Sequence, residues 1–199
     1  MKRIILSLAL IAVAGTGIIG ATRAYFSDTE TSTGNSFAAG TLDLNLDGVN
    51  TNVVKFSLTN LVPGDLGTGT WILYNAGSIN GYVDIHSIAR TDNDNLCNEP
   101  EGLVDTTCGA GEGELSANMN VDLFIDVDHD GVFDAEDTTI YTGLLSGIAV
   151  NYDQNIALNA LATKYISLNW GIPSGAGNNI QSDSVSVDMT FELGQTTAQ

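Results

Sequence analysis

An alternation of apolar and polar residues constrains this chain more than any other feature. It is clearest in residues 185–193, where Val185, Val187, Met189, Phe191 and Leu193 alternate with polar side chains. This period of two is typical of a strand with one buried face. The same pattern, or a run rich in β-branched and aromatic residues, predicts further strands at residues 42–47, 54–59, 69–74, 81–88, 121–127, 138–144 and 164–170. Helical spacing occurs only at residues 155–162, over a short stretch. The sequence therefore predicts an all-β fold, a jelly-roll-type β-sandwich of about eight strands.

The first 24 residues have the layout of a secretory signal peptide. Lys2 and Arg3 precede an apolar run at residues 4–14, and small residues follow up to Ala24. We expect cleavage between Ala24 and Tyr25, which leaves residues 25–199 as a single secreted, extracellular domain at the cell surface or in a matrix. The alternative is an uncleaved anchor, because the uncharged residues 4–21 reach the lower limit for a membrane span. Only this segment would then contact the membrane.

The charge balance excludes one class of partner. The chain has 24 acidic and 6 basic residues. Cleavage would leave Lys55, Arg90 and Lys164 as its only basic side chains. Because binding to phosphates needs clustered lysine and arginine, we expect no nucleic acid partner.

The two cysteines lie close together in the sequence. In an exported protein, Cys97 and Cys108 predict a disulfide that closes a loop within residues 92–117. A metal-binding or redox pair is the alternative, although neither C-x-x-C spacing nor a nearby histidine supports it.

Residues 126–137 (DVDHDGVFDAED) have the ligand spacing of an EF-hand loop. Such a loop takes its oxygen ligands from positions 1, 3, 5, 7, 9 and 12 and has a glycine at position 6. The predicted Ca²⁺ ligands are the side chains of Asp126, Asp128, Asp130, Asp134 and Asp137 and the carbonyl of Val132. Position 12 is aspartate where an EF-hand has glutamate, and the flanking segments read as strands. We therefore predict an EF-hand-like Ca²⁺ loop in a β-hairpin. An acidic, solvated turn is the alternative.

No residue pattern supports catalysis. His86 and His129 are the only histidines, and the sequence has neither an H-E-x-x-H nor a G-x-S-x-G motif. We therefore expect no enzyme activity and assign no catalytic residue. A glycan-binding or adhesion module is another possibility, because aromatic side chains can stack on sugars; the candidates are Trp71, Tyr74, Tyr82, Tyr152 and Trp170.

Several segments together resemble one family. Residues 24–28 (AYFSD) and 37–44 (FAAGTLDL) are similar to the start of the TasA/camelysin proteins. Residues 58–65 (LTNLVPGD) and 75–78 (NAGS) are similar to turns of that family, and the strand at residues 185–193 also fits. The resemblance implies processing by a SipW-type signal peptidase and a role as a jelly-roll subunit of biofilm-matrix fibres built from copies of the chain itself. The metalloprotease activity associated with camelysin is the alternative, but no zinc-ligand motif in this sequence corresponds to it.

Assembly of such fibres would need a segment that joins one subunit to the next. Residues 25–36 begin with two large apolar side chains, Tyr25 and Phe26, and continue with a polar stretch that is too weak for an internal core strand. We expect this segment to act as a donor strand that completes the sheet of a neighbouring copy. A disordered tail is the alternative.

Overall fold

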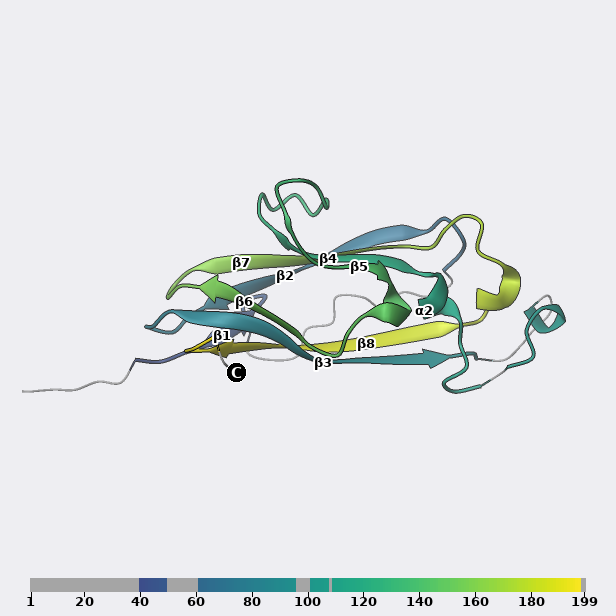
Figure 1. Ribbon diagram of the computed structural model, residues 1–199, viewed down its shortest axis with the longest axis horizontal. Coiled ribbons are helices and arrows are strands. Elements are labelled where there is room, and N and C mark those ends of the chain that lie inside the picture. Colours follow the sequence, from purple (N-terminus) through teal and green to yellow (C-terminus); the bar gives the residue numbers. More distant parts are fainter. Residues whose placement is uncertain (1–39, 50–60, 96–100, 108, 198–199) are drawn as a thin grey trace, which may run out of the picture. The chain divides into compact units, whose positions relative to one another are not determined.

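Two antiparallel sheets form the fold. The computed structural model describes residues 40–49, 61–95, 101–107 and 109–197. The strands are β1 (Leu44–Leu46), β2 (Leu66–Asn75), β3 (Gly81–Asn93), β4 (Asn120–Asp126), β5 (Thr138–Leu144), β6 (Tyr152–Leu158), β7 (Thr163–Gly171) and β8 (Ser184–Gly194). Short helical turns lie between them: η1 (Glu101–Leu103), α2 (Leu115–Asn118), η2 (Leu145–Gly147) and η3 (Asn178–Ile180). The larger sheet has the strand order β1-β2-β7-β4-β5 and the smaller one β6-β3-β8 (Figure 1).

The two sheets share one hydrophobic core. Trp71 and Leu73 of β2 and Ile166 of β7 enter it from the larger sheet, and Val83 and Ile85 of β3 enter it from the smaller one. These residues stand at alternate positions of their strands, so that the period-two pattern places them on the inner face. The prediction of an all-β sandwich is thereby confirmed.

The strand predictions agree with the structure except at two places. No strand was predicted at residues 155–162, whose short stretch of spacing is helical, but the first four belong to strand β6, where Ile156 and Leu158 are buried opposite β3. Strand pairing with β3 therefore decides their conformation, not their local spacing. The first predicted strand is shorter than expected, because β1 covers only Leu44–Leu46. The strand predicted at residues 54–59 lies outside the described residues.

A turn after β2 holds the segment that leads into β1. Asn75 is fully buried; its side-chain amide donates to the carbonyls of Ile79 at 2.9 Å and Leu158 at 3.1 Å, and its Oδ1 accepts from the Gly77 amide at 3.0 Å. Ser78 then pairs with Thr41 twice. The Ser78 amide donates to the Thr41 carbonyl at 2.9 Å, and the Ser78 hydroxyl accepts from the Thr41 amide at 3.0 Å. The NAGS sequence thus fixes the point at which the chain enters the sandwich.

No helix within the described ranges has the length and apolar character needed to span a membrane. The signal peptide, the cleavage site at Ala24 and Tyr25, and the donor segment with Phe26 lie outside the described residues. The same is true of Cys97 and Cys108, so that the predicted disulfide stays a prediction.

Candidate functional site

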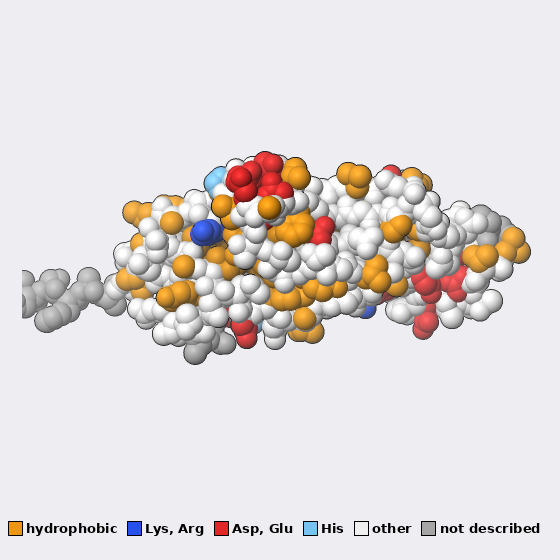
Figure 2. Space-filling model, turned by 45° about the horizontal axis from the view of Figure 1, so that its top comes forward, with side chains coloured by type: hydrophobic (Ala, Val, Ile, Leu, Met, Phe, Trp, Pro, Cys, Tyr) orange, Lys and Arg blue, Asp and Glu red, His pale blue; other side chains and the backbone are white. Residues whose placement is uncertain are grey.

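The predicted Ca²⁺ loop connects β4 to β5. These two strands pair antiparallel from Asn120 opposite Leu144 to Ile125 opposite Thr138, so that residues 126–137 form the tip of a β-hairpin. In Figure 1 the loop projects from the larger sheet, and in Figure 2 acidic side chains gather there at the surface. Asp128, Asp130, Asp134 and Glu136 of the loop are exposed.

Asp126 organises the base of the loop from inside the sheet. Its side chain is only 2% exposed. Oδ1 accepts from the His129 amide at 2.7 Å, and Oδ2 accepts from the Gly131 amide at 3.1 Å and from the Ser167 hydroxyl of β7 at 2.8 Å. Hydrogen bonds to an ionised carboxylate are stronger than bonds between neutral groups. Position 1 of the loop is therefore fixed to the scaffold, as a rigid ligand position requires.

The first three aspartates lie together. One carboxylate oxygen from each of Asp126, Asp128 and Asp130 falls within 4.8 Å of the other two. Ligands of one Ca²⁺ at about 2.4 Å can be at most about 4.8 Å apart. These three carboxylates therefore have a spacing that one Ca²⁺ can bridge.

The last two aspartates of the motif do not join this group. Asp137 accepts from the Val127 amide at 2.9 Å and from the Asp134 amide at 3.1 Å, while Asp134 accepts from the Glu136 amide at 2.8 Å. Their carboxylates are directed at the backbone of the loop. Val132 is 57% exposed, and its amide donates to Asp130 at 2.7 Å. Binding of one ion by all six predicted ligands would require Asp134 and Asp137 to move toward the other three carboxylates.

Positive backbone angles account for the sharp turn at the tip. His129 has φ 68° and Gly131 has φ 73°, both in the left-handed region. Glycine adopts this conformation without steric cost, which explains its place in the motif. The His129 ring lies against Tyr165, with ring centroids 3.8 Å apart. The His129 side chain therefore packs against Tyr165 of β7 and is not part of the aspartate group.

Two partners of the loop could not be recognised from the sequence. Ser167 and Asn169 stand on β7, far from the loop along the chain. In the amide orientation that satisfies its neighbours, Asn169 donates to the Gly131 carbonyl at 3.0 Å and accepts from the Phe133 amide at 3.2 Å. Only the pairing of β4 with β7, which sets Phe124 opposite Ser167, reveals this support.

A second group of acidic side chains lies outside the hairpin. Burial raises the pKa of Asp183 to about 6; hydrogen bonds from the Glu114 and Leu115 amides oppose this shift, and the charges of Glu101 and Asp94 add to it. Burial also raises the pKa of Glu114 to about 7, together with a hydrogen bond that its protonated form donates to Asp105 and the charges of Asp105 and Asp183. Negative charge is therefore costly in this region of the fold.

The other proposed sites find little support among the described residues. Trp71 is 6% exposed and Trp170 is 8% exposed, so that both tryptophans belong to the core and offer no open stacking face. In the described ranges, the groups that could hold a metal contain carboxylates alone. His86 lies 3.9 Å from Glu192 and joins neither group.

Comparison with known proteins identifies one family. The family model described as camelysin metallo-endopeptidase matches residues 1–192. No curated protein matches the chain.

Proposed function

Because the chain belongs to the camelysin family, which is the TasA/camelysin family of the resemblance above, we propose that it is a secreted structural subunit of extracellular biofilm-matrix fibres. Its copies would join by donor-strand exchange. The observation that carries the proposal is the set of open strand edges. Among the described residues, β6 and β8 each pair with β3 alone, and β5 pairs with β4 alone. An edge strand has unpaired backbone groups that can accept a strand from another chain.

The position of the donor segment fits this proposal. In the sequence, residues 25–36 come shortly before Thr41, which Ser78 holds against the sandwich. A donor segment that starts from this fixed point would leave the domain at a defined position. Because donor and acceptor are different surfaces of one chain, the contact is head-to-tail and permits linear growth.

The first prediction concerns assembly. Deletion of residues 25–36 should leave a folded, monomeric protein that forms no fibres in negative-stain images. Replacement of Tyr25 and Phe26 by serine should have the same effect, because the two rings would fill the acceptor groove. Thr31→Ser with Thr33→Ser is the matched control in the polar part of the segment and should assemble normally. Fibres of normal appearance after the deletion would remove donor-strand exchange from the proposal.

The second prediction concerns export. A SipW-type signal peptidase should cut between Ala24 and Tyr25, so that mass spectrometry of secreted protein gives a chain that begins at Tyr25. A chain that keeps residues 1–24 would instead indicate a membrane anchor.

Ca²⁺ is the proposed cofactor. We propose that the aspartates of residues 126–137 bind one Ca²⁺, with the Val132 carbonyl as a further ligand. The grouping of Asp126, Asp128 and Asp130 supports this assignment. Three carboxylates so close together repel one another, and a divalent cation removes that repulsion.

A metallo-endopeptidase is the second candidate, favoured by the description of the family. Zinc in proteases is held by histidine together with carboxylates or further histidines, and neither carboxylate group in the described residues includes a histidine. The two candidates are separated by incubation of the purified protein with casein, with and without a zinc chelator. Chelator-sensitive cleavage would favour the protease over the fibre subunit.

A further inference from the structure

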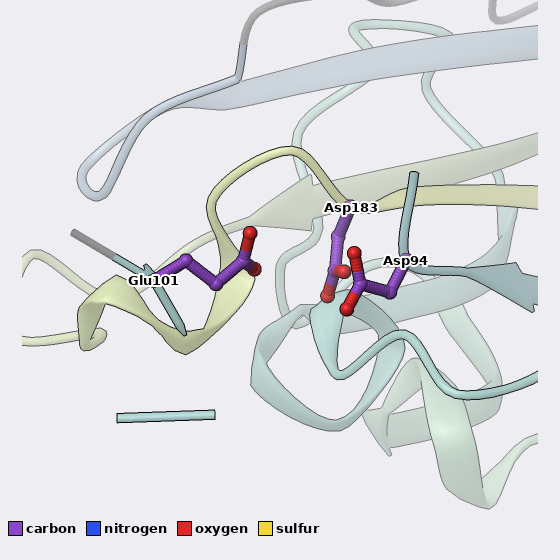
Figure 3. Close-up of side chains that lie close together, drawn as sticks. All are labelled: Asp94, Glu101 and Asp183. Atoms are coloured by element: carbon purple, nitrogen blue, oxygen red, sulfur yellow. The ribbon is translucent and has the colours of Figure 1, made fainter. Parts of the chain in front are cut away.

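Three carboxylates from distant parts of the chain meet at one place. Asp94 follows β3, Glu101 begins η1, and Asp183 precedes β8. One oxygen from each lies within 4.8 Å of the other two. Asp94 is 3% exposed and Glu101 is fully buried. Figure 3 shows the carboxylate of Glu101 directed toward Asp183, with Asp94 beside it.

In two of these carboxylates, one oxygen accepts hydrogen bonds and the other has no hydrogen-bond partner. Glu101 Oε2 accepts from the Ser182 hydroxyl at 2.7 Å, and Asp183 Oδ2 accepts from the amides of Glu114 at 2.6 Å and Leu115 at 2.8 Å. Glu101 Oε1 and Asp183 Oδ1 are buried and have no hydrogen-bond partner. The described part of the chain gives neither residue an ion pair, since its salt bridges join His86 to Glu192 and Arg90 to Asp92.

Without a bound cation, this arrangement of buried carboxylates is energetically unfavourable. A buried carboxylate oxygen without a partner loses its hydration and gains nothing in return. Glu101 is the sharper case, because its side chain is fully buried and its free oxygen belongs to a group with two further acids. A cation between the three carboxylates would give the two free oxygens a partner and would offset the repulsion between the three negative charges.

We propose that Asp94, Glu101 and Asp183 form a second divalent-cation site, separate from the hairpin loop, that binds Ca²⁺. The ligands are hard carboxylate oxygens, without the nitrogen or sulfur that zinc prefers. Oxygens up to about 4.8 Å apart can share one Ca²⁺ at about 2.4 Å. Water completes the coordination shell.

The site would tie three segments into one unit. Asp94 comes at the end of β3, Asp183 at the start of β8, and the two strands pair from Asn93 opposite Ser184 onward. Glu101 brings in η1, which lies between the two cysteines in the sequence. The ion would thus fix the long connection between β3 and β4 to the end of the smaller sheet.

The test separates this site from the hairpin loop. In the background Asp128→Asn with Asp130→Asn, the loop loses two of its five predicted carboxylate ligands and keeps only Asp126 of the group that lies together. We therefore expect the loop to bind no Ca²⁺ in this background, so that a remaining Ca²⁺ effect comes from elsewhere. We expect isothermal titration calorimetry to give one Ca²⁺ per chain in this background, and we expect the melting temperature to rise from a chelated sample to one with millimolar Ca²⁺. Addition of Glu101→Gln should abolish both effects, while Glu112→Gln, at an exposed acid nearby, should leave both unchanged.

A second variant guards against misfolding. Asp183→Asn keeps an oxygen for the Glu114 and Leu115 amides but removes the charge, and it should also abolish binding in this background. The proposal is overturned if the background protein binds no Ca²⁺, or if Glu101→Gln and Asp183→Asn both retain full binding. If the hairpin loop does not bind Ca²⁺ at all, the unmodified protein should still bind one Ca²⁺ at the second site, and Glu101→Gln alone should abolish this binding.

Discussion

Asp126→Ala should destabilise the protein by about 3 kcal/mol and abolish Ca²⁺ binding at the hairpin loop. The substitution removes the acceptor of three hydrogen bonds, from His129, Gly131 and Ser167. Each donor left unsatisfied at a buried site costs about 1–3 kcal/mol, although water can reach the two loop amides more easily than Ser167, which is fully buried. For a chain of this length, about 3 kcal/mol corresponds to a fall in melting temperature of roughly 6–12 °C. Thermal unfolding followed by circular dichroism in chelator measures this loss.

A comparison of stability with and without Ca²⁺ then separates the loss of hydrogen bonds from the loss of Ca²⁺ binding. In the unmodified protein, Ca²⁺ at one hundred times the dissociation constant should add about 2.7 kcal/mol of stability. Asp128→Asn is the matched control: this side chain is exposed and accepts only one weak bond, from the Asp130 amide at 3.4 Å. It should weaken Ca²⁺ binding at the loop with little loss of stability in chelator. If Asp126→Ala and Asp128→Asn behave alike in chelator, Asp126 does not organise the loop.

The contrast between the two acidic groups shows what a single sequence can reveal. The hairpin loop was predictable because its aspartates are neighbours along the chain and follow a known spacing. Asp94, Glu101 and Asp183 have no such spacing, and only the pairing of β3 with β8 brings two of them together. Glu101 is fully buried. The acidic sequence around it has no pattern that would indicate this burial.

The strands show the same division. Strands β4 and β8 have a clear period-two pattern, which predicts them, while β2, β3, β5 and β7 were predicted without so clear an alternation. β6 was missed because its sequence, YDQNIAL, has a regular pattern only in its last residues, and its pairing with β3 shifts register between Val83 and Ile85. Where a strand pairs irregularly, its buried positions no longer fall at every second residue, and tertiary contacts decide the conformation.

Gly77→Ala should cost about 3 kcal/mol and release the segment at residues 40–46 from the sandwich. A Cβ at this position would collide with the Thr41 carbonyl oxygen, and it would lie 2.9 Å from both the Asp43 amide nitrogen and Asn75 Oδ1. Thr41 and Asp43 belong to the segment, and Asn75 belongs to the turn that holds it, so that the collision can be relieved only by separating the segment from the turn. The bonds from Ala76 to Asp43 and from Ser78 to Thr41 would then be lost. Overpacking costs about 1–3 kcal/mol and each lost hydrogen bond about 1 kcal/mol.

Hydrogen exchange measures this release directly. The amides of Leu44, Asn45 and Leu46 in β1 should exchange much faster in Gly77→Ala, while those of β4 and β7 should stay protected, because the core between the sheets is unchanged. Gly175→Ala is the matched control, since a Cβ there has no atom within 4 Å. In the fibre proposal, the loss of the fixed point should also reduce assembly, because the donor segment then leaves the domain from no defined position. Unchanged exchange at β1 would mean that the turn does not hold the segment, and normal fibres despite faster exchange would mean that assembly does not depend on this fixed point.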